Sequence, residues 1–195
     1  QSLTFVATAN AIKYCGGEPI FLDIDSETLS LSPSAVASFL DEKSYICDDG
    51  HCRLKSDKRI IRCCLPMHTF GAIGHISEIN RICEKHNINV IEDAAEALGS
   101  FQKGKHAGLF GSMGALSFNG NKIITTGGGG AILCATKDYE KIKHLTTTAK
   151  VPHQYEYSHD RLGFNYRLPN LNAALGVGQM SQLQEILNSK KILTD

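Results

Sequence analysis

The chain has 195 residues, of which 42% are hydrophobic and 21% charged, a balance typical of a globular domain long enough to bury a core. Lysine plus arginine and aspartate plus glutamate each number 20, so the formal net charge is zero and neither nucleic acid nor an anionic membrane is expected as a partner. No apolar run is long enough to span a membrane and the first residues do not resemble a signal peptide, so a cytoplasmic protein is expected.

The seven cysteines form an odd-numbered set, and several lie within apolar patterns. We expect them to act as small buried hydrophobic residues and not as a disulfide framework. Cys47, His51 and Cys52 could be drawn as a zinc site with Cys63 and Cys64, but the usual C-x2-C spacing is missing. A hairpin whose turn is DDG is the favoured interpretation, and no metal site is expected.

Apolar periodicity predicts helices that alternate with strands along the chain. In chain order, we expect a helix over 5–14, a strand over 18–24, a helix over 32–42, a strand over 58–66, a helix over 75–86, a strand over 88–94, strands over 114–120 and 129–136, and helices over 137–148 and 168–191. Such alternation is typical of an α/β fold with a mostly parallel sheet flanked by helices. A single domain over residues 1–195 is the expected organisation.

Two chemically distinctive residues follow predicted strands, where ligands bind in open α/β sheets. Asp93 ends the pattern INVIED, and Lys122 lies in the turn after ALSF. Pyridoxal phosphate (PLP) requires a lysine amine for a Schiff base, a carboxylate that keeps the pyridine nitrogen protonated, and donors for its phosphate. Ser117 offers a hydroxyl to the phosphate, and glycines 127–130 would let the backbone pass close by. Together these residues predict a PLP site.

Each of these features has an ordinary explanation when taken alone. A lysine in a turn is usually solvated, an aspartate after a strand is often a helix cap, and a run of glycines is more often a tight connection than a phosphate cradle. The glycine run lacks the G-x-G-x-x-G spacing of a nicotinamide-binding domain, which argues against that class.

Longer motifs resemble one family. VIEDAAEALGS followed by GSMGALSFNGNKIITTGGGGAIL is similar to the DegT/DnrJ/StrS-type PLP-dependent nucleotide-sugar aminotransferases, which are built on the aspartate aminotransferase fold, or fold type I. SLTFVATANAI, PMHTFGAIGHISEI and HDRLGFNYRLPNLNAALG match as well, so the resemblance covers essentially the whole chain. It implies the large PLP-binding domain of that fold, as a fragment that lacks the family's N-terminal segment and C-terminal small domain.

The resemblance implies roles for three residues around the cofactor ring. Lys122 would hold PLP through a Schiff base and then carry a proton between the substrate carbon and the cofactor carbon. Asp93 would pair with the pyridinium nitrogen. Glu96 stands where many family members have glutamine or histidine beside the ring hydroxyl.

Further residues match family positions around the ring face and the phosphate. Phe5 matches the aromatic residue that stacks on the ring, and Ser117 matches a phosphate contact. Asn165 resembles the residue that the other subunit of a homodimer supplies to the phosphate, with Arg167 as its neighbour at that contact. His68 lies in a family motif, where it either holds a turn or takes part in catalysis.

The reaction that the resemblance implies is a ping-pong transfer of an amino group, by family analogy from glutamate, to a nucleotide-linked 4-keto-6-deoxy sugar. The motif SFNGNKIITTGGGG is most similar to enzymes of surface polysaccharide synthesis, such as those of the perosamine and legionaminic acid pathways. Related sugar 3-dehydratases typically have histidine at the lysine position, so Lys122 favours transamination. The alternative is a binding or regulatory module with the same fold and no catalysis.

Overall fold

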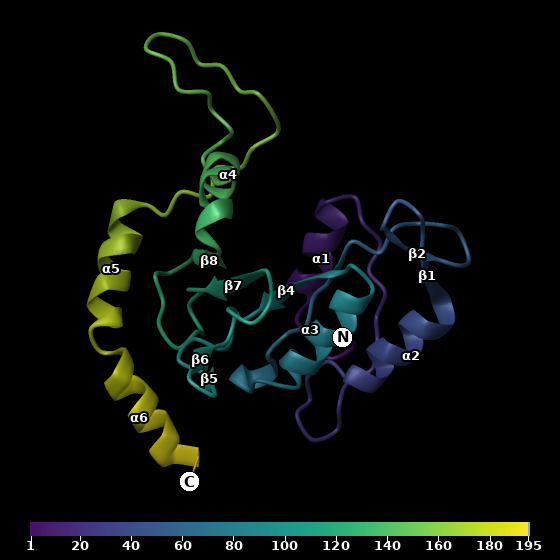
Figure 1. Cartoon of the computed structure of the whole chain (residues 1–195). Coiled ribbons are helices and arrows are strands. Elements are labelled where there is room, and N and C mark those ends of the chain that lie inside the picture. The colour runs from purple at the N-terminus through teal and green to yellow at the C-terminus, as the bar shows by residue number, and fades with distance from the viewer. Residues whose placement is uncertain (195) are drawn as a thin grey trace. The chain divides into compact units, whose positions relative to one another are not determined.

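The computed structural model describes residues 1–194 and divides into two compact units, Gln1–Leu116 and Ser117–Asp195, each of which is described by itself (Figure 1). The first unit carries a parallel β-sheet with helices packed on it, so the α/β prediction is confirmed. The expectation of one domain over the whole chain stays a prediction.

The parallel strands of the first unit are β3 (Cys63–Cys64), β4 (Asn89–Asp93) and β7 (Met113–Ser117), of which the last residue, Ser117, is counted with the second unit. Strand β4 lies in the middle, with Cys63 opposite Asn89 on one side and Asp93 opposite Ala115 on the other. Because all three strands run in the same direction, their carboxyl ends lie at one edge of the sheet. Asp93, as predicted, is the last residue of the central strand.

The core of the first unit lies around helix α3 (Ile76–Lys85), which packs against both strand β4 and helix α2 (Pro33–Lys43) (Figure 1). Helix α2 begins as predicted, because the Ser32 hydroxyl accepts a hydrogen bond of 3.3 Å from the backbone N–H of Ala35. Helix α3 has apolar residues at helical spacing, which turns one face inward against β4. The buried side chains that pack together are Leu31, Val36, Leu40, Cys52, Ile76, Ile79, Ile82, Cys83, Ile88 and Val90.

Three smaller elements and one helix complete the first unit. Helix α1 (Val6–Tyr14) forms over the predicted range, and η1 (Thr69–Gly71) is a single short turn. Strands β1 (Ser44–Ile46) and β2 (Cys52–Leu54) pair as a hairpin, which confirms the interpretation of the DDG turn. Gly50 in this turn has φ of +80° with open space around it, a backbone conformation that suits glycine. Strands β5 (Phe101–Gln102) and β6 (Lys105–His106) form a second hairpin, which was not predicted.

The second unit contains β8 (Gly130–Cys134) and the helices α4 (Thr136–Thr146), α5 (Asn170–Met180) and α6 (Leu183–Thr194). Residues 147–168, which we call the arm, run out from α4 and return as a long loop before α5 (Figure 1). Single antiparallel bridges between Thr147 and Asn165 and between Lys150 and His159 hold the two sides of the arm together.

Three predicted elements were wrong in extent. The segment 18–24 forms no strand, because its backbone makes isolated contacts with Ser2 and the Leu31–Ser32 region and no continuous ladder. The segment 58–66 is split: Ile60 bridges to Arg53 of the hairpin, Cys63–Cys64 form the strand of the sheet, and the Pro66 carbonyl accepts a single hydrogen bond from Asp93.

The helix predicted over 168–191 is broken into α5 and α6. The Ser181 hydroxyl and the Gln182 side-chain amide both donate to the carbonyl oxygen of Gly178, at 2.8 and 3.4 Å. Side chains that bond nearby carbonyls in this way compete with the backbone hydrogen bonds of a helix. The break therefore follows from local side-chain chemistry.

Among residues 1–194, no helix is long and apolar enough to cross a membrane. In the same part of the chain, no three histidine, cysteine, aspartate or glutamate side chains gather as metal ligands would, and all seven cysteines are free thiols.

Candidate active site

Asp93 is held at the carboxyl end of β4 by hydrogen bonds to both of its carboxylate oxygens. The Thr8 hydroxyl donates to Oδ2 at 2.5 Å, and the backbone N–H of Ala95 donates to Oδ1 at 3.1 Å. An ionised carboxylate is an acceptor only, so both contacts suit the charged form. These two donors fix the side chain at the edge of the sheet where a ligand is expected.

Phe5 lies at the start of the helix that supplies Thr8. It is the N-cap residue of α1, and its backbone carbonyl accepts from the N–H of Thr8 at 3.3 Å. Its side chain is 70% exposed, which leaves the ring surface accessible to a flat ligand. The first turn of α1 thus connects the aromatic ring to the residue that binds Asp93.

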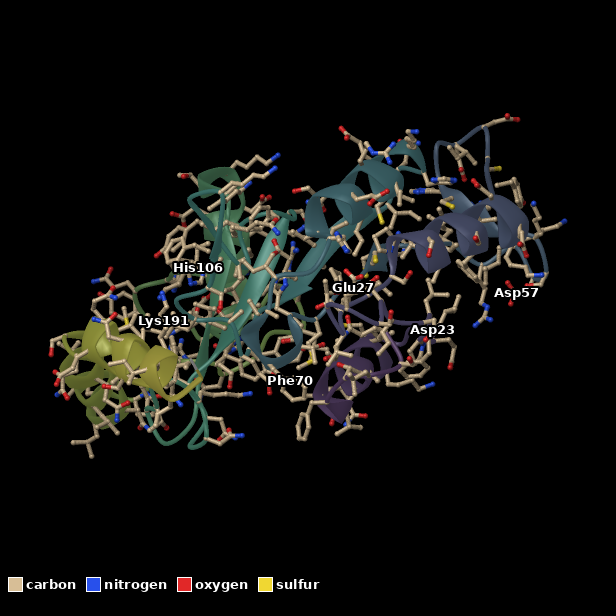
Figure 2. The ribbon with its side chains drawn as sticks, turned by 90° about the horizontal axis from the view of Figure 1, so that it is seen from below. Asp23, Glu27, Asp57, Phe70, His106 and Lys191 are labelled. Carbon is tan, nitrogen blue, oxygen red and sulfur yellow. The ribbon has the colours of Figure 1, made fainter. Side chains whose placement is uncertain are left out.

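Glu96 follows β4 and meets a strained segment of the backbone. Its Oε2 accepts a hydrogen bond of 2.9 Å from the N–H of Phe70, which has φ of +53°. A Cβ atom added to the next residue, Gly71, would lie 2.7 Å from the carbonyl oxygen of Glu96, so only glycine fits there. Phe70, labelled in Figure 2, leaves its ring 78% exposed beside this contact.

Glu92 precedes Asp93 but plays a different part, because successive strand residues face opposite sides of a sheet. It is fully buried and accepts from His68 Nε2 at 2.7 Å, from the Gly108 N–H at 2.8 Å and from the Gly111 N–H at 2.5 Å. Burial by itself raises the pKa of Glu92, but the hydrogen bonds from these three partners lower it more, so the pKa lies below its ordinary value. His68 is therefore a buried structural partner of Glu92, which favours the first of its two predicted roles.

Lys122 lies in a loop closed by pairs of backbone hydrogen bonds in the second unit. The N–H of Phe118 donates to the carbonyl of Gly129, and the N–H of Thr126 donates to the carbonyl of Phe118, both at 2.9 Å. Within this loop the backbone N–H of Lys122 donates to Asn119 at 3.1 Å, and the side chain is half-buried. The hydroxyl of Ser117, the last residue of β7, accepts from the Asn119 N–H at 3.3 Å.

Helix α5 fastens the lysine loop from the other side. The amide of Asn172 donates to the carbonyl of Thr126, and the Gln179 side chain accepts from the N–H of Thr125 at 2.7 Å. Gly176 lets the helix come close, because a Cβ atom there would lie 2.9 Å from Thr126 Cγ2. Residues of the motif LPNLNAALGVGQ thus bind the backbone of the loop that carries Lys122.

The glycine run after the loop behaves as a tight connection. Gly127 and Gly129 have φ of +78° and +113°, which other residues rarely adopt, and a Cβ atom at Gly129 would lie 2.7 Å from Leu168 Cδ1. The backbone conformation of this unit therefore explains why glycine is present at these two positions.

Asn165 lies where the arm rejoins the unit. Its backbone bridges to Thr147, and its Oδ1 accepts from Arg167 at 3.1 Å. A second nitrogen of Arg167 donates to the carbonyl of Thr147 at 3.1 Å. Arg167 thus orients the exposed amide of Asn165. The acceptors of these two hydrogen bonds from the Arg167 guanidinium are both uncharged oxygens.

The structure therefore gathers the candidate residues in two sets, one within each unit. Phe5, Asp93 and Glu96 belong to the first unit, and Ser117, Lys122 and Asn165 to the second. The pairing of Lys122 with Asp93 across one pyridine ring stays a prediction. Sequence reasoning missed Thr8 and Glu92; the helical spacing from Phe5 to Thr8 and the alternation along β4 were the signals that could have found them.

The whole chain, residues 1–195, matches the model of the DegT/DnrJ/EryC1/StrS aminotransferase family. The chain belongs to this family. EpsN of Bacillus subtilis, a protein proposed to be a pyridoxal phosphate-dependent aminotransferase, is 37% identical over 194 residues, which are 99% of this chain and 47% of that protein. The GDP-perosamine synthase of Escherichia coli O157:H7 is 36% identical over 195 residues, or 100% of this chain and 49% of the relative.

A crystal structure of a family member from Brucella abortus has the same fold. It superposes with a TM-score of 0.80 at 26% identity and covers 94% of this chain and 47% of that chain. The DegT/DnrJ/EryC1/StrS chain described here thus spans about half the length of the relatives it matches. The resemblance to the family and to its fold is confirmed.

PLP is the cofactor that membership of this family implies. The donor chemistry of the chain fits it: Asp93 offers an oriented carboxylate, Phe5 an open ring face, Lys122 an amine and Ser117 a hydroxyl. These four groups are of the kinds that the ring nitrogen, the ring face, the aldehyde and the phosphate each require.

Proposed function

We propose that the protein transfers an amino group from an amino acid, glutamate by family analogy, to a nucleotide-linked 4-keto-6-deoxy sugar during surface polysaccharide synthesis. The observation that carries the proposal is Asp93, which ends the central parallel strand with one donor on each carboxylate oxygen. The match to GDP-perosamine synthases supports the sugar class, because those relatives cover nearly the whole of this chain.

When bound, PLP supplies an aldehyde for amine exchange and a protonated ring that withdraws electrons from the substrate carbon. Asp93 keeps the proton on the ring nitrogen, since its negative charge favours the protonated ring. Lys122 would hold the cofactor through Nζ and would carry a proton on the same atom once the donor amine has displaced it. The loop that α5 fastens keeps this amine in place.

The remaining residues bind and orient. Phe5 would cover one face of the ring, Ser117 would donate to the phosphate and Glu96 would lie beside the ring hydroxyl. Asn165, oriented by Arg167, completes the phosphate contacts of a second subunit, so the protein works as a homodimer. We also place it in the cytoplasm, with small-molecule substrates and neither nucleic acid nor membrane as partner.

The absorption spectrum of the PLP-loaded protein tests the role of Lys122. We expect a visible band that glutamate bleaches, and Lys122→Ala should lose the band. Lys143→Ala, an exposed lysine of α4, is the matched control and should keep it. Equal spectra for the two variants would contradict the assignment, and a band that glutamate leaves unchanged would favour the non-catalytic alternative.

The sugar substrate is tested with the complete protein. Mass spectrometry of products from a panel of 4-keto nucleotide sugars should show the mass change of amination for a 4-keto-6-deoxy member. Amination of sugars outside this class alone would overturn the substrate assignment.

A further inference from the structure

A hollow of about 560 Å³ lies beside the arm of the second unit, within the range of about 300–1,000 Å³ of ligand sites. It is lined by Thr147, Lys150, Pro152, His153, Gln154 and Arg167. Of these lining residues, all of which the structure describes, two carry a positive charge and none carries a negative one. The hollow therefore has the charge that an anion requires.

Lys150 is held in place by a neutral partner. Its Nζ lies 3.7 Å from the centre of the Tyr157 ring. A cation above an aromatic face is attracted by the ring, but its charge is not neutralised as it would be by a carboxylate. Lys150 thus keeps both an ordered position and its charge for a ligand.

Arg167 is oriented in the same manner. Two of its nitrogens donate to the amide oxygen of Asn165 and to the carbonyl of Thr147, which are both uncharged. A guanidinium has five N–H donors, so these two bonds leave others for a ligand. Asn165 itself is not among the residues that line the hollow.

His153 has its tautomer set by the backbone. Its Nδ1 accepts from the N–H groups of Glu156 at 2.9 Å and Tyr155 at 3.3 Å. A ring nitrogen that accepts from N–H groups carries no proton, so the neutral ring has its proton on Nε2. His153 therefore adds a hydrogen-bond donor to the two cations.

The arm carries two acidic residues, Glu156 and Asp160, and neither lines the hollow. Asp160 binds His144 Nε2 at 2.7 Å and lies 3.7 Å from Arg161. By contrast, the hollow between α2 and α3 in the first unit has Asp25, Asp41 and Glu78 among its lining residues. The hollow beside the arm thus differs from the hollow in the first unit, because no carboxylate is among its described lining residues.

We propose that this hollow binds the diphosphate group of the nucleotide-linked substrate. Two fixed cations and a fixed N–H donor match an anion that carries several phosphate oxygens over more than one phosphorus atom. The inference rests on the proposed function for the source of the diphosphate, a nucleoside diphosphate sugar. The site belongs to the substrate. Asn165, which is assigned to the cofactor phosphate, does not line it, although Arg167 contacts both Asn165 and the hollow.

Calorimetric titration of the full protein without added PLP tests the site. GDP and inorganic pyrophosphate should bind, and guanosine should not. Lys150→Gln should weaken GDP binding about tenfold, as expected for a lost hydrogen bond to a charged group. Arg167→Gln is a second variant with the same expected direction, and circular dichroism checks that it folds.

Lys141→Gln is the matched control, because Lys141 is an exposed lysine on α4 of the same unit and does not line the hollow. It should leave GDP affinity unchanged. The inference is overturned if Lys150→Gln binds GDP as tightly as the wild type, if Lys141→Gln weakens binding equally, or if guanosine binds as well as GDP. Binding of pyrophosphate with no binding of GDP would also overturn the nucleotide source.

The titration and the spectral test fail independently. If PLP gives no absorption band but Lys150→Gln still weakens GDP binding, the aminotransferase proposal fails and the diphosphate site stands. If the band appears and is lost in Lys122→Ala, while GDP affinity does not change in Lys150→Gln, the diphosphate inference alone fails.

Discussion

The two compact units of the chain differ in how they bury apolar side chains. The first unit has a continuous core around Ile76, Ile79 and Val90. In the described part of the second unit, the buried hydrophobic residues are Ile124 and Ala149 alone. The first unit therefore has a packed apolar core, whereas the loop of the second unit is ordered mainly by hydrogen bonds and turns.

The same difference appears in the helices. Helix α3 buries four residues, while α4 and α5, which are described over their full length, contain none that are buried. Large apolar side chains of α5 and α6, such as Leu171 and Ile192, are 86% and 77% exposed. Helices α5 and α6 thus leave much of their apolar surface uncovered. The lysine loop thus belongs to the less well-packed unit, and the carboxylate to the better-packed one.

The largest effect should come from removing the buried acid of the first unit. Glu92→Ala leaves His68 and the N–H groups of Gly108 and Gly111 without their acceptor, which should lower the free energy of unfolding by about 3–5 kcal/mol. Urea unfolding measures the loss. Glu140→Ala, at an exposed position of α4 in the second unit, should change stability by less than about 0.5 kcal/mol, and equal losses would contradict the contrast between units.

A cavity in the core should have the next largest effect. Ile79 is 1% exposed, so Ile79→Ala should lower the free energy of unfolding by roughly 2–5 kcal/mol. Val177 of α5 is 74% exposed, and Val177→Ala should cost less than about 0.5 kcal/mol. Urea denaturation of both variants compares the units directly. A costly Val177→Ala would mean that α5 has a buried role.

A smaller effect is expected for the donor that orients Asp93. Thr8→Val removes the hydroxyl and keeps the shape, so PLP should bind about tenfold more weakly by absorbance titration. Thr8→Ser should restore the affinity, because it retains the hydroxyl. Thr136→Val, at an exposed position of α4, is the control in the second unit. Unchanged affinity in Thr8→Val would show that Asp93 does not depend on this contact.

The smallest expected effect is on the pH dependence of the free energy of unfolding. Hydrogen bonds hold the pKa of Glu92 below its ordinary value of 4.5, so the unfolded chain takes up its proton at higher pH than the folded protein does. The stability that Glu92 contributes is therefore present above pH 4.5 and is lost as the pH falls through the lower pKa of the folded state. Urea midpoints between pH values of about 7 and about 3 should fall less steeply for Glu92→Gln than for the wild type. Parallel curves would contradict this.

Local patterns in the sequence were enough for much of the first unit. The apolar spacing of Ile76, Ile79 and Cys83 predicts α3, and Ser32 before Pro33 predicts the start of α2. A buried run that ends in an acid predicts Asp93 at the edge of the sheet. In each case the signal lies within a few residues of the element that it determines.

The rest depends on partners that are distant in sequence. The segment 58–66 pairs first with the β1–β2 hairpin and then with the sheet. The residues of the segment do not themselves indicate the position at which the pairing partner changes. Thr8 and Asp93 are 85 positions apart, so no local pattern links them. The break between α5 and α6 is different, because it is local: Ser181 and Gln182 donate to the Gly178 carbonyl, but both residues are common in helices and do not by themselves predict a break.

The turn between β1 and β2 is a suitable place to insert a tag into this protein. Asp48, Asp49 and Gly50 are exposed, and the turn carries none of the residues assigned to the cofactor or the diphosphate. Exposed turns of this kind tolerate inserted peptides well. An affinity tag or a split reporter placed there would allow purification or immobilisation of the protein without changing any residue assigned to either proposed binding site.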